Sequence, residues 1–138
     1  MDPEELKLRT KKFNLRIIKL YRSLPKEKDA QVLGYQMLRS GTSVGANYRA
    51  ACRARSQADF ISKITIVEEE ADETSYWLEL LIESGIMKKE LLSDLMKESN
   101  ELTAIFTSSG HTAKLKLNNP QSKIRNLNNP KSKIRNPQ

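Results

Sequence analysis

The apolar residues between positions 60 and 81 recur with a heptad spacing, and this period constrains the fold more than any other feature of the chain. Steps of four and three residues alternate through three cycles at Phe60, Ile64, Val67, Ala71, Thr74, Leu78 and Leu81. Such spacing places one apolar stripe along a helix that packs lengthwise on other helices. Ser56 and Asp59 form a capping-box pattern before the stripe, and Gly85 offers a left-handed C-cap after it. We predict a helix between Ser56 and Gly85.

Three further segments have a helical period. The first covers about residues 4 to 23 and is interrupted at Leu24-Pro25. The second begins at Pro25 and continues to about residue 52, and the fourth begins near residue 86 and fades at 107–110. No segment has strand alternation between turn signals. The predicted fold is therefore all-α, an antiparallel up-and-down four-helix bundle formed by residues 1–112.

The positive charge of the chain is concentrated at its C-terminal end. The formal net charge is +7, and residues 113–138 hold seven Lys and Arg and no acid, so residues 1–112 are neutral. Residues 117–126 recur as residues 127–136 with one difference, Gln121 against Lys131. Two short polar repeats cannot build a core, so we predict a disordered basic tail over residues 113–138. A translated DNA repeat without a role is favoured over a basic arm that grips phosphates.

The second helix contains three glycines on one side, Gly34, Gly41 and Gly45. Each costs about 1 kcal/mol of helix stability relative to alanine, so close packing should compensate. Large side chains such as Phe13, Tyr76 or Trp77 could fill the space that the glycines leave. Packing inside the bundle is favoured over a ligand cleft.

Arginines gather at the end of this helix and just after it. Arg39, Arg49 and Arg53 fall within an arc of roughly 80° on a continuous helix, and Arg55 follows. They are candidate phosphate contacts for a nucleic acid. The alternative, held nearly even, is that they pair with the acidic run at residues 68–73.

The helix after Ser56 has a second, weaker apolar stripe at Ile66, Trp77 and Leu80. A tryptophan outside the main seam suits a subunit interface, where aromatic residues are enriched. We predict that these three residues contribute to a homo-oligomer.

The residues needed for most enzyme classes are missing from the sequence. The sole histidine, His111, follows the fourth helical pattern, and no zinc spacing or glycine-rich phosphate loop occurs. We expect no catalytic residue, metal, cofactor or small-molecule substrate. A single cysteine, Cys52, the absence of a long apolar run and a charged N-terminus favour a cytoplasmic protein without membrane association.

Three motifs follow one another along the second and third predicted helices. Their positions are Arg39, Ser43, Asn47, Arg53, Ser56, Asp59, Phe60, Glu69, Glu73 and Trp77. Together they resemble the family of four-helix-bundle proteins encoded by intervening sequences of bacterial 23S ribosomal RNA genes. The resemblance covers about residues 5 to 108. It implies an up-and-down bundle that assembles into a ring-like homopentamer, and kinship with the accessory subunit of diversity-generating retroelements, which binds a reverse transcriptase and nucleic acid.

The leading hypothesis from the sequence is a non-enzymatic homo-oligomeric bundle that binds RNA or DNA weakly through Arg39, Arg49, Arg53 and Arg55. The rival hypothesis is a scaffold that presents the ring to a protein partner such as a reverse transcriptase. In that case the arginines serve internal ion pairs.

Overall fold

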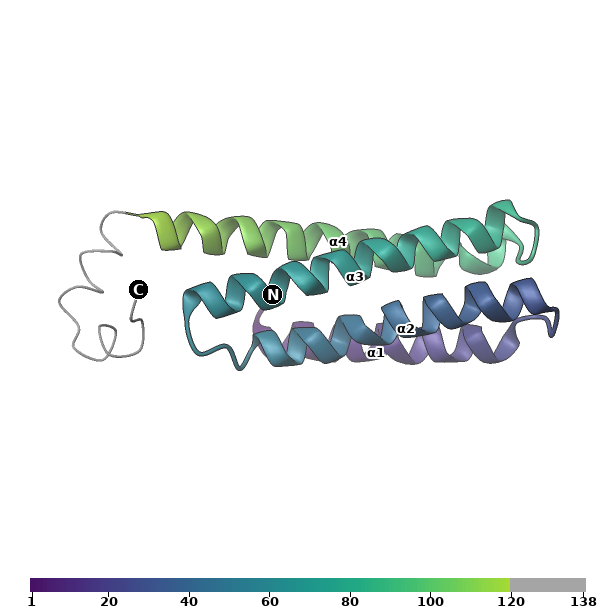
Figure 1. Cartoon of the computed structure of the whole chain (residues 1–138), viewed down its shortest axis with the longest axis horizontal. Helices are drawn as coiled ribbons and strands as arrows, with labels where there is room; N and C mark the ends of the chain where they lie inside the picture. The colour runs from purple at the N-terminus through teal and green to yellow at the C-terminus, as the bar shows by residue number, and fades with distance from the viewer. Residues whose placement is uncertain (120–138) are drawn as a thin grey trace.

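Four antiparallel α-helices make up the computed structural model, which describes residues 1–119 (Figure 1). They are α1 (Pro3–Ser23), α2 (Lys28–Ala51), α3 (Gln57–Glu83) and α4 (Lys89–Asn118). Consecutive helices pack along their lengths, whereas α1 and α4 touch over a short stretch. In Figure 1, α1 and α2 form one layer of an elongated bundle, and α3 and α4 form the other. The predicted all-α, up-and-down bundle is confirmed.

The helix ends follow the local signals in the sequence. The Asp2 carboxylate accepts a hydrogen bond from the Glu5 N–H at 2.8 Å and caps α1. Ser56 Oγ accepts from the Asp59 N–H at 3.0 Å and caps α3. Gly85 ends the same helix with φ of 82°, the left-handed conformation that glycine adopts without strain. The predicted start and end of α3 are thus confirmed.

The heptad positions of α3 form the centre of the hydrophobic core. Six of them are buried, and Phe60 is half-buried. Phe13 and Ile17 from α1, Met37 from α2, and Leu102 and Phe106 from α4 are buried with them. A single core therefore joins all four helices.

Two pairs of buried hydroxyl groups link neighbouring helices inside this core. Thr74 Oγ1 lies 2.9 Å from Ser40 Oγ, which joins α3 to α2. Ser75 Oγ lies 2.7 Å from Ser99 Oγ, which joins α3 to α4, and Ser99 also donates to the Ala71 carbonyl at 3.2 Å. A buried hydroxyl without a partner is costly, so a sliding of either helix would be penalised. These pairs favour one axial register of the helices.

The three glycines of α2 lie against α1. A Cβ at Gly41 would come within 2.8 Å of Ile17 Cγ2. A Cβ at Gly34 would clash with Leu24, and one at Gly45 would clash with Asn14. The glycines therefore allow close packing of α1 on α2, as expected. The space is filled by Asn14, Ile17 and Tyr21 of α1 and by Leu24 just after it. The predicted Tyr76 and Trp77 belong to α3, on another side of α2, and Phe13, although on α1, is not among the nearest side chains.

Two predicted helix boundaries are wrong. The helix α2 begins at Lys28, not at Pro25, because Leu24 is extended before the proline and residues 25–27 form the turn. The helix α4 does not end at 107–110 but continues to Asn118, because Gly110 and Ala113 are buried and tertiary packing outweighs the weak local signal. The boundary predicted at residue 112 thus falls within a helix. The remainder of the predicted tail, residues 120–138, lies outside the described residues.

Candidate nucleic-acid interface

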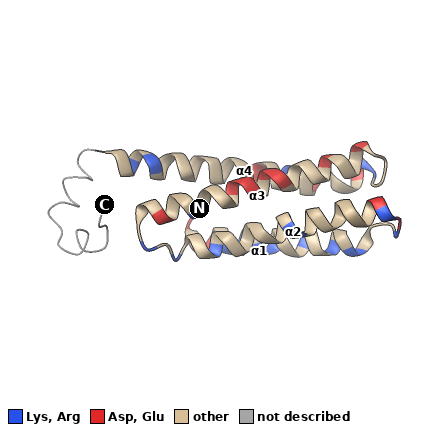
Figure 2. Ribbon diagram, in the orientation of Figure 1, with Lys and Arg blue, Asp and Glu red and all other residues tan. Residues whose placement is uncertain are grey.

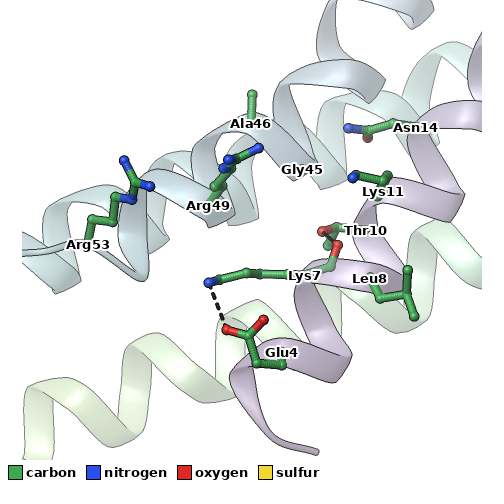
Figure 3. Close-up of a pocket in the computed structure, with 10 residues that line it drawn as sticks. All are labelled: Glu4, Lys7, Leu8, Thr10, Lys11, Asn14, Gly45, Ala46, Arg49 and Arg53. Atoms are coloured by element: carbon green, nitrogen blue, oxygen red, sulfur yellow. Dashed lines mark hydrogen bonds and ion pairs between the residues drawn. The ribbon is translucent and has the colours of Figure 1, made fainter.

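A groove with a volume of about 510 Å³ lies between α1 and the C-terminal half of α2 (Figure 3). Gly45 and Ala46 line it, and their small side chains keep it open. Ten residues line the groove in all: Glu4, Lys7, Leu8, Thr10, Lys11, Asn14, Gly45, Ala46, Arg49 and Arg53. The glycines thus produce both close packing and, at the end of α2, a surface depression.

Four cationic side chains line the groove, two from each side. Lys7 and Lys11 lie one helical turn apart on α1, and Figure 3 shows Lys7 reaching Glu4 below Arg49 and Arg53. Arg49 lies in the last turn of α2, and Arg53 lies in the turn that follows. Against these four, Glu4 is the one acidic residue of the lining. The groove therefore has a net positive charge.

Most of this positive charge has no acidic partner. Lys7 pairs with Glu4 at 2.9 Å, and this pair is exposed to solvent. Lys11, Arg49 and Arg53 are exposed and form no ion pair within residues 1–119. Three guanidinium or ammonium groups are thus free to contact an anion without first breaking an internal bond.

Asn14 is a polar residue of the groove lining. Its Nδ2 donates to the Thr42 carbonyl at 3.2 Å and so connects α1 to α2. Its Oδ1 is buried and has no hydrogen-bond partner among the described residues. The amide therefore holds the two walls of the groove together while one of its acceptors remains unsatisfied.

Arg39 lies apart from the groove. Its guanidinium contacts Glu73 at 2.6 Å and Glu70 at 3.5 Å on α3, and Glu73 also accepts from Trp77 Nε1 at 3.1 Å. The hydrogen bond to Glu73 raises the pKa of Arg39 above its ordinary value. The predicted arc of roughly 80° is wide enough for its two edges to face different neighbouring helices. Arg49 lies on the side of α2 facing α1, and Arg39 lies on the side facing α3.

The acidic partners of Arg39 differ in their environments. Burial raises the pKa of the Glu70 carboxyl, and the nearby Arg39 opposes this shift without overcoming it. Glu73 contacts both Arg39 and Trp77. Arg39 therefore forms ion pairs with the acidic run of α3, which was the alternative to phosphate contact.

Arg55 belongs to the connection between α2 and α3. Its backbone N–H donates to the Asp59 carboxylate at 3.1 Å, and its side chain is exposed. Asp59 also contacts Lys63 at 2.6 Å, and these two interactions lower the pKa of the Asp59 carboxyl. Arg55 lies two residues beyond Arg53 but does not line the groove.

The other motif residues serve mainly local structure. Ser43 Oγ donates to the Arg39 carbonyl at 2.7 Å, and Asn47 Nδ2 donates to the Ser43 carbonyl at 2.8 Å, so both bond within α2. Ser56 and Asp59 cap α3, and Phe60 is half-buried. Glu69 is exposed, and its side chain makes no hydrogen bond or ion pair in the described part of the chain. These positions shape α2 and the start of α3.

The predicted interface residues lie on α3 with different exposures. Ile66 is 42% exposed, whereas Trp77 and Leu80 are half-buried. The Tyr76 and Trp77 rings pack edge to face with centroids 5.2 Å apart, and Tyr76 is itself exposed. Of the three predicted interface residues, Ile66 is therefore the exposed one, and Tyr76 is a further exposed apolar residue on the same helix.

Within residues 1–119 no three His, Cys, Asp or Glu side chains are placed to share a metal ion. Cys52 is half-buried beside Tyr48, whose pKa is raised chiefly by burial and further by Cys52. None of the described helices is long and apolar enough to cross a membrane.

Sequence reasoning missed Lys7 and Lys11, and with them a larger charge pattern. Residues 1–56 carry thirteen Lys and Arg against five Asp and Glu, whereas residues 57–112 carry four against twelve. The net charge of residues 1–112 is zero because +8 on residues 1–56 cancels −8 on residues 57–112. Figure 2 shows the result, with most blue residues on α1 and α2 and most red ones on α3 and α4. A count by predicted helix pair would have revealed this division.

Comparison with known proteins places the bundle among relatives. Residues 5–108 match the family model described as 23S rRNA-intervening sequence protein. One similar crystal structure is described as a protein with unknown function from the S23 ribosomal protein family of Bacteroides thetaiotaomicron. It has 40% sequence identity and a TM-score of 0.74, and the match covers 80% of this chain and 99% of that chain. A comparison with curated proteins gives no match.

Proposed function

The chain belongs to the family of 23S rRNA-intervening sequence proteins, and from that premise we propose that it is a non-enzymatic, homo-oligomeric bundle that binds nucleic acid. The groove between α1 and α2 is the proposed binding site. The observation that supports this proposal most directly is the set of three unpaired cations, Lys11, Arg49 and Arg53, around one depression.

The chemistry of the groove suits phosphate groups. Arginine offers a planar fork that binds phosphate oxygens in pairs, and lysine adds a point charge. Both act on the sugar-phosphate backbone and carry no base information by themselves. Association should therefore weaken steeply with salt, because each neutralised phosphate releases a counterion.

A gel-shift titration tests the proposal with the full chain and a structured ribosomal RNA fragment at 50 and 200 mM salt. The Arg49→Gln/Arg53→Gln variant should lower affinity at 50 mM salt and reduce the salt slope by about 2. Lys89→Gln/Lys97→Gln is the matched control, since it removes the same charge from exposed positions of α4. Absence of binding by the wild-type chain at 50 mM salt, or equal losses in both variants, would overturn the proposal.

Assembly of several copies is the second part of the proposal. The apolar stripe of Ile66, Trp77 and Leu80 supports it, because Ile66 is 42% exposed and a copy that covers this side of α3 would remove all three side chains from water. Light scattering should give a mass several times that of one chain, five times for the pentamer expected from the resemblance. Ile66→Lys should lower this mass, whereas Leu91→Lys on α4, at a leucine 67% exposed, should not. A monomeric wild-type chain would contradict this part.

A protein scaffold remains the second candidate function, and the pairing of Arg39 with Glu70 and Glu73 favours it. In this function the arginines stabilise the bundle, and the assembled surface binds a protein partner such as a reverse transcriptase. Recovery of one defined protein and no nucleic acid with the purified bundle would support the scaffold.

A further inference from the structure

The outer face of α1 carries a row of basic side chains that extends well beyond the groove. Six bases face away from the core along this helix: Lys7, Lys11, Lys12, Arg16, Lys19 and Arg22. Lys7 and Arg22 lie fifteen positions apart, which corresponds to about 22 Å of helix. We call these six residues the α1 basic row.

The α1 basic row is available for binding. Five of its members are exposed, and Lys7 is half-buried beside the groove. Apart from the Lys7 contact with Glu4, none of them forms an ion pair within the described chain. Glu4 and Glu5 are the acidic residues of α1, and both lie in its first turn. The remaining length of the helix therefore has a positive outer face, as the blue positions along α1 in Figure 2 show.

The same face offers nothing for bases to stack on. Tyr35 and Tyr76, the most exposed aromatic residues among positions 1–119, belong to α2 and α3. Phe13 is buried in the core, and Tyr21 packs against Gly34. Single-stranded nucleic acids are usually held by aromatic side chains on which bases stack. Leu8 and Leu15 are exposed between the members of the α1 basic row, but neither offers a ring, so the row can hold a nucleic acid only by its charge.

The six bases spread over the outer half of α1 and follow the axis of one rigid helix, and such an array fits a stiff polyanion better than a flexible one. One strand of a duplex presents a phosphate per about 3.4 Å of its axis, so about six phosphates lie along the length that the six bases cover. A duplex is already rigid on this scale, whereas a single strand would lose conformational freedom when it aligned with the helix.

From these observations we infer that the ligand of the proposed site is double-helical nucleic acid, whose backbone lies along the α1 basic row and continues into the groove at Arg49 and Arg53. This inference rests on the proposed function and specifies its ligand. Recognition is by phosphate position, so the duplex sequence has little effect on affinity.

The test uses the full chain with four probes: a 20-base-pair RNA duplex, a DNA duplex of the same sequence, one unpaired strand of each. Lys12→Gln/Arg16→Gln/Lys19→Gln removes three cations of the α1 basic row that do not line the groove. Lys88→Gln/Lys89→Gln/Lys97→Gln is the charge-matched control, because it removes three exposed cations from the acidic half of the chain. Circular dichroism checks that each variant retains its helices.

Each duplex should bind at least ten times more tightly than its own strand. Each phosphate contact contributes a factor of about 3.5 to the loss of affinity between 50 and 200 mM salt. The row variant should therefore reduce that loss by up to about 40-fold, and the control should leave it unchanged. The ratio of RNA to DNA affinity identifies the natural polymer.

Two results would overturn the inference while leaving the proposed function intact. One is equal binding of strand and duplex with continued dependence on Arg49 and Arg53. The other is an unchanged salt slope in the row variant. If no probe binds at 50 mM salt, the proposed function and this inference are both wrong.

Discussion

Gly41 lies where α2 has no room for a methyl group. An added Cβ would lie 2.8 and 2.9 Å from two carbons of Ile17, a fully buried and β-branched residue that cannot turn away. We expect Gly41→Ala to destabilise the protein by about 1–3 kcal/mol despite the better helix propensity of alanine. Urea denaturation measures this free energy of unfolding.

Gly110 provides the matched comparison. It lies in the interior of α4, where a Cβ would meet Ile64 at 3.5 Å, an ordinary van der Waals contact. Gly110→Ala should therefore stabilise the protein by up to about 1 kcal/mol. If both substitutions destabilise it equally, close packing on α1 is not the reason for the glycine at position 41.

Asp59 couples the start of α3 to pH. Its carboxyl has a pKa below the ordinary value because of Lys63 and the Arg55 N–H, so the ionised form stabilises the folded state. This contribution is complete above the pKa that the Asp59 carboxyl has in the unfolded chain. It disappears as the pH falls through the lower pKa that the carboxyl has in the folded protein. Asp59→Asn should lower the melting temperature at pH 7, and the difference from wild type should close as the pH falls through the lowered pKa of the Asp59 carboxyl. Asp94→Asn, at an exposed and unpaired position of α4, should show no such closure.

At the scale of elements, the C-terminal turns of α4 are part of the folded bundle. Ala113 is buried, and its carbonyl accepts from Gln57 Nε2 at 3.2 Å, so this part of α4 holds the start of α3. A chain ending at residue 112 should be less stable than one ending at residue 119 by about 1 kcal/mol or more. Thermal unfolding of the two fragments, with Gln57→Ala in the longer one, separates the hydrogen bond from the packing. Equal melting temperatures would contradict this role.

The helices themselves were predictable where local signals agreed. The start and end of α3 followed from Ser56 and Gly85, and its buried face followed from the heptad period. The end of α4 was not predictable, because Thr107-Ser-Ser-Gly110 has weak helix propensity and is held in the helix by its contact with α3. Propensity alone cannot report a contact between segments that are distant in the sequence.

The candidate site was predictable only in part for a similar reason. The sequence placed Arg39, Arg49 and Arg53 in one stripe, but which helix packs on each flank of α2 depends on the arrangement of the bundle. That arrangement separates Arg39, which binds Glu73, from Arg49 and Arg53, which line the groove with Lys7. Lysines of a different helix cannot be assigned to a groove before its two walls are known.

For the whole molecule, the division of charge links stability to ionic strength. The α1–α2 layer contacts the acidic layer through Arg9, which binds Glu98 at 2.6 and 2.8 Å, and through Arg39. Residues 57–119 carry six bases against twelve acids, so the two layers attract each other. Salt screens this attraction, since the Debye length falls from about 30 Å at 10 mM to about 8 Å at 150 mM.

The melting temperature of residues 1–119 should therefore fall as NaCl rises from 10 to 150 mM. The exposed Arg39 pair contributes little, and the half-buried Arg9 pair contributes more, so we expect a loss of about 1 kcal/mol, or roughly 4 °C. Arg9→Gln/Glu98→Gln should flatten this dependence, because it removes the bidentate contact between the layers without changing the net charge. A melting temperature that rises with NaCl in this range would mean that repulsion within each layer outweighs attraction between them. The charge division would then serve binding at the expense of stability.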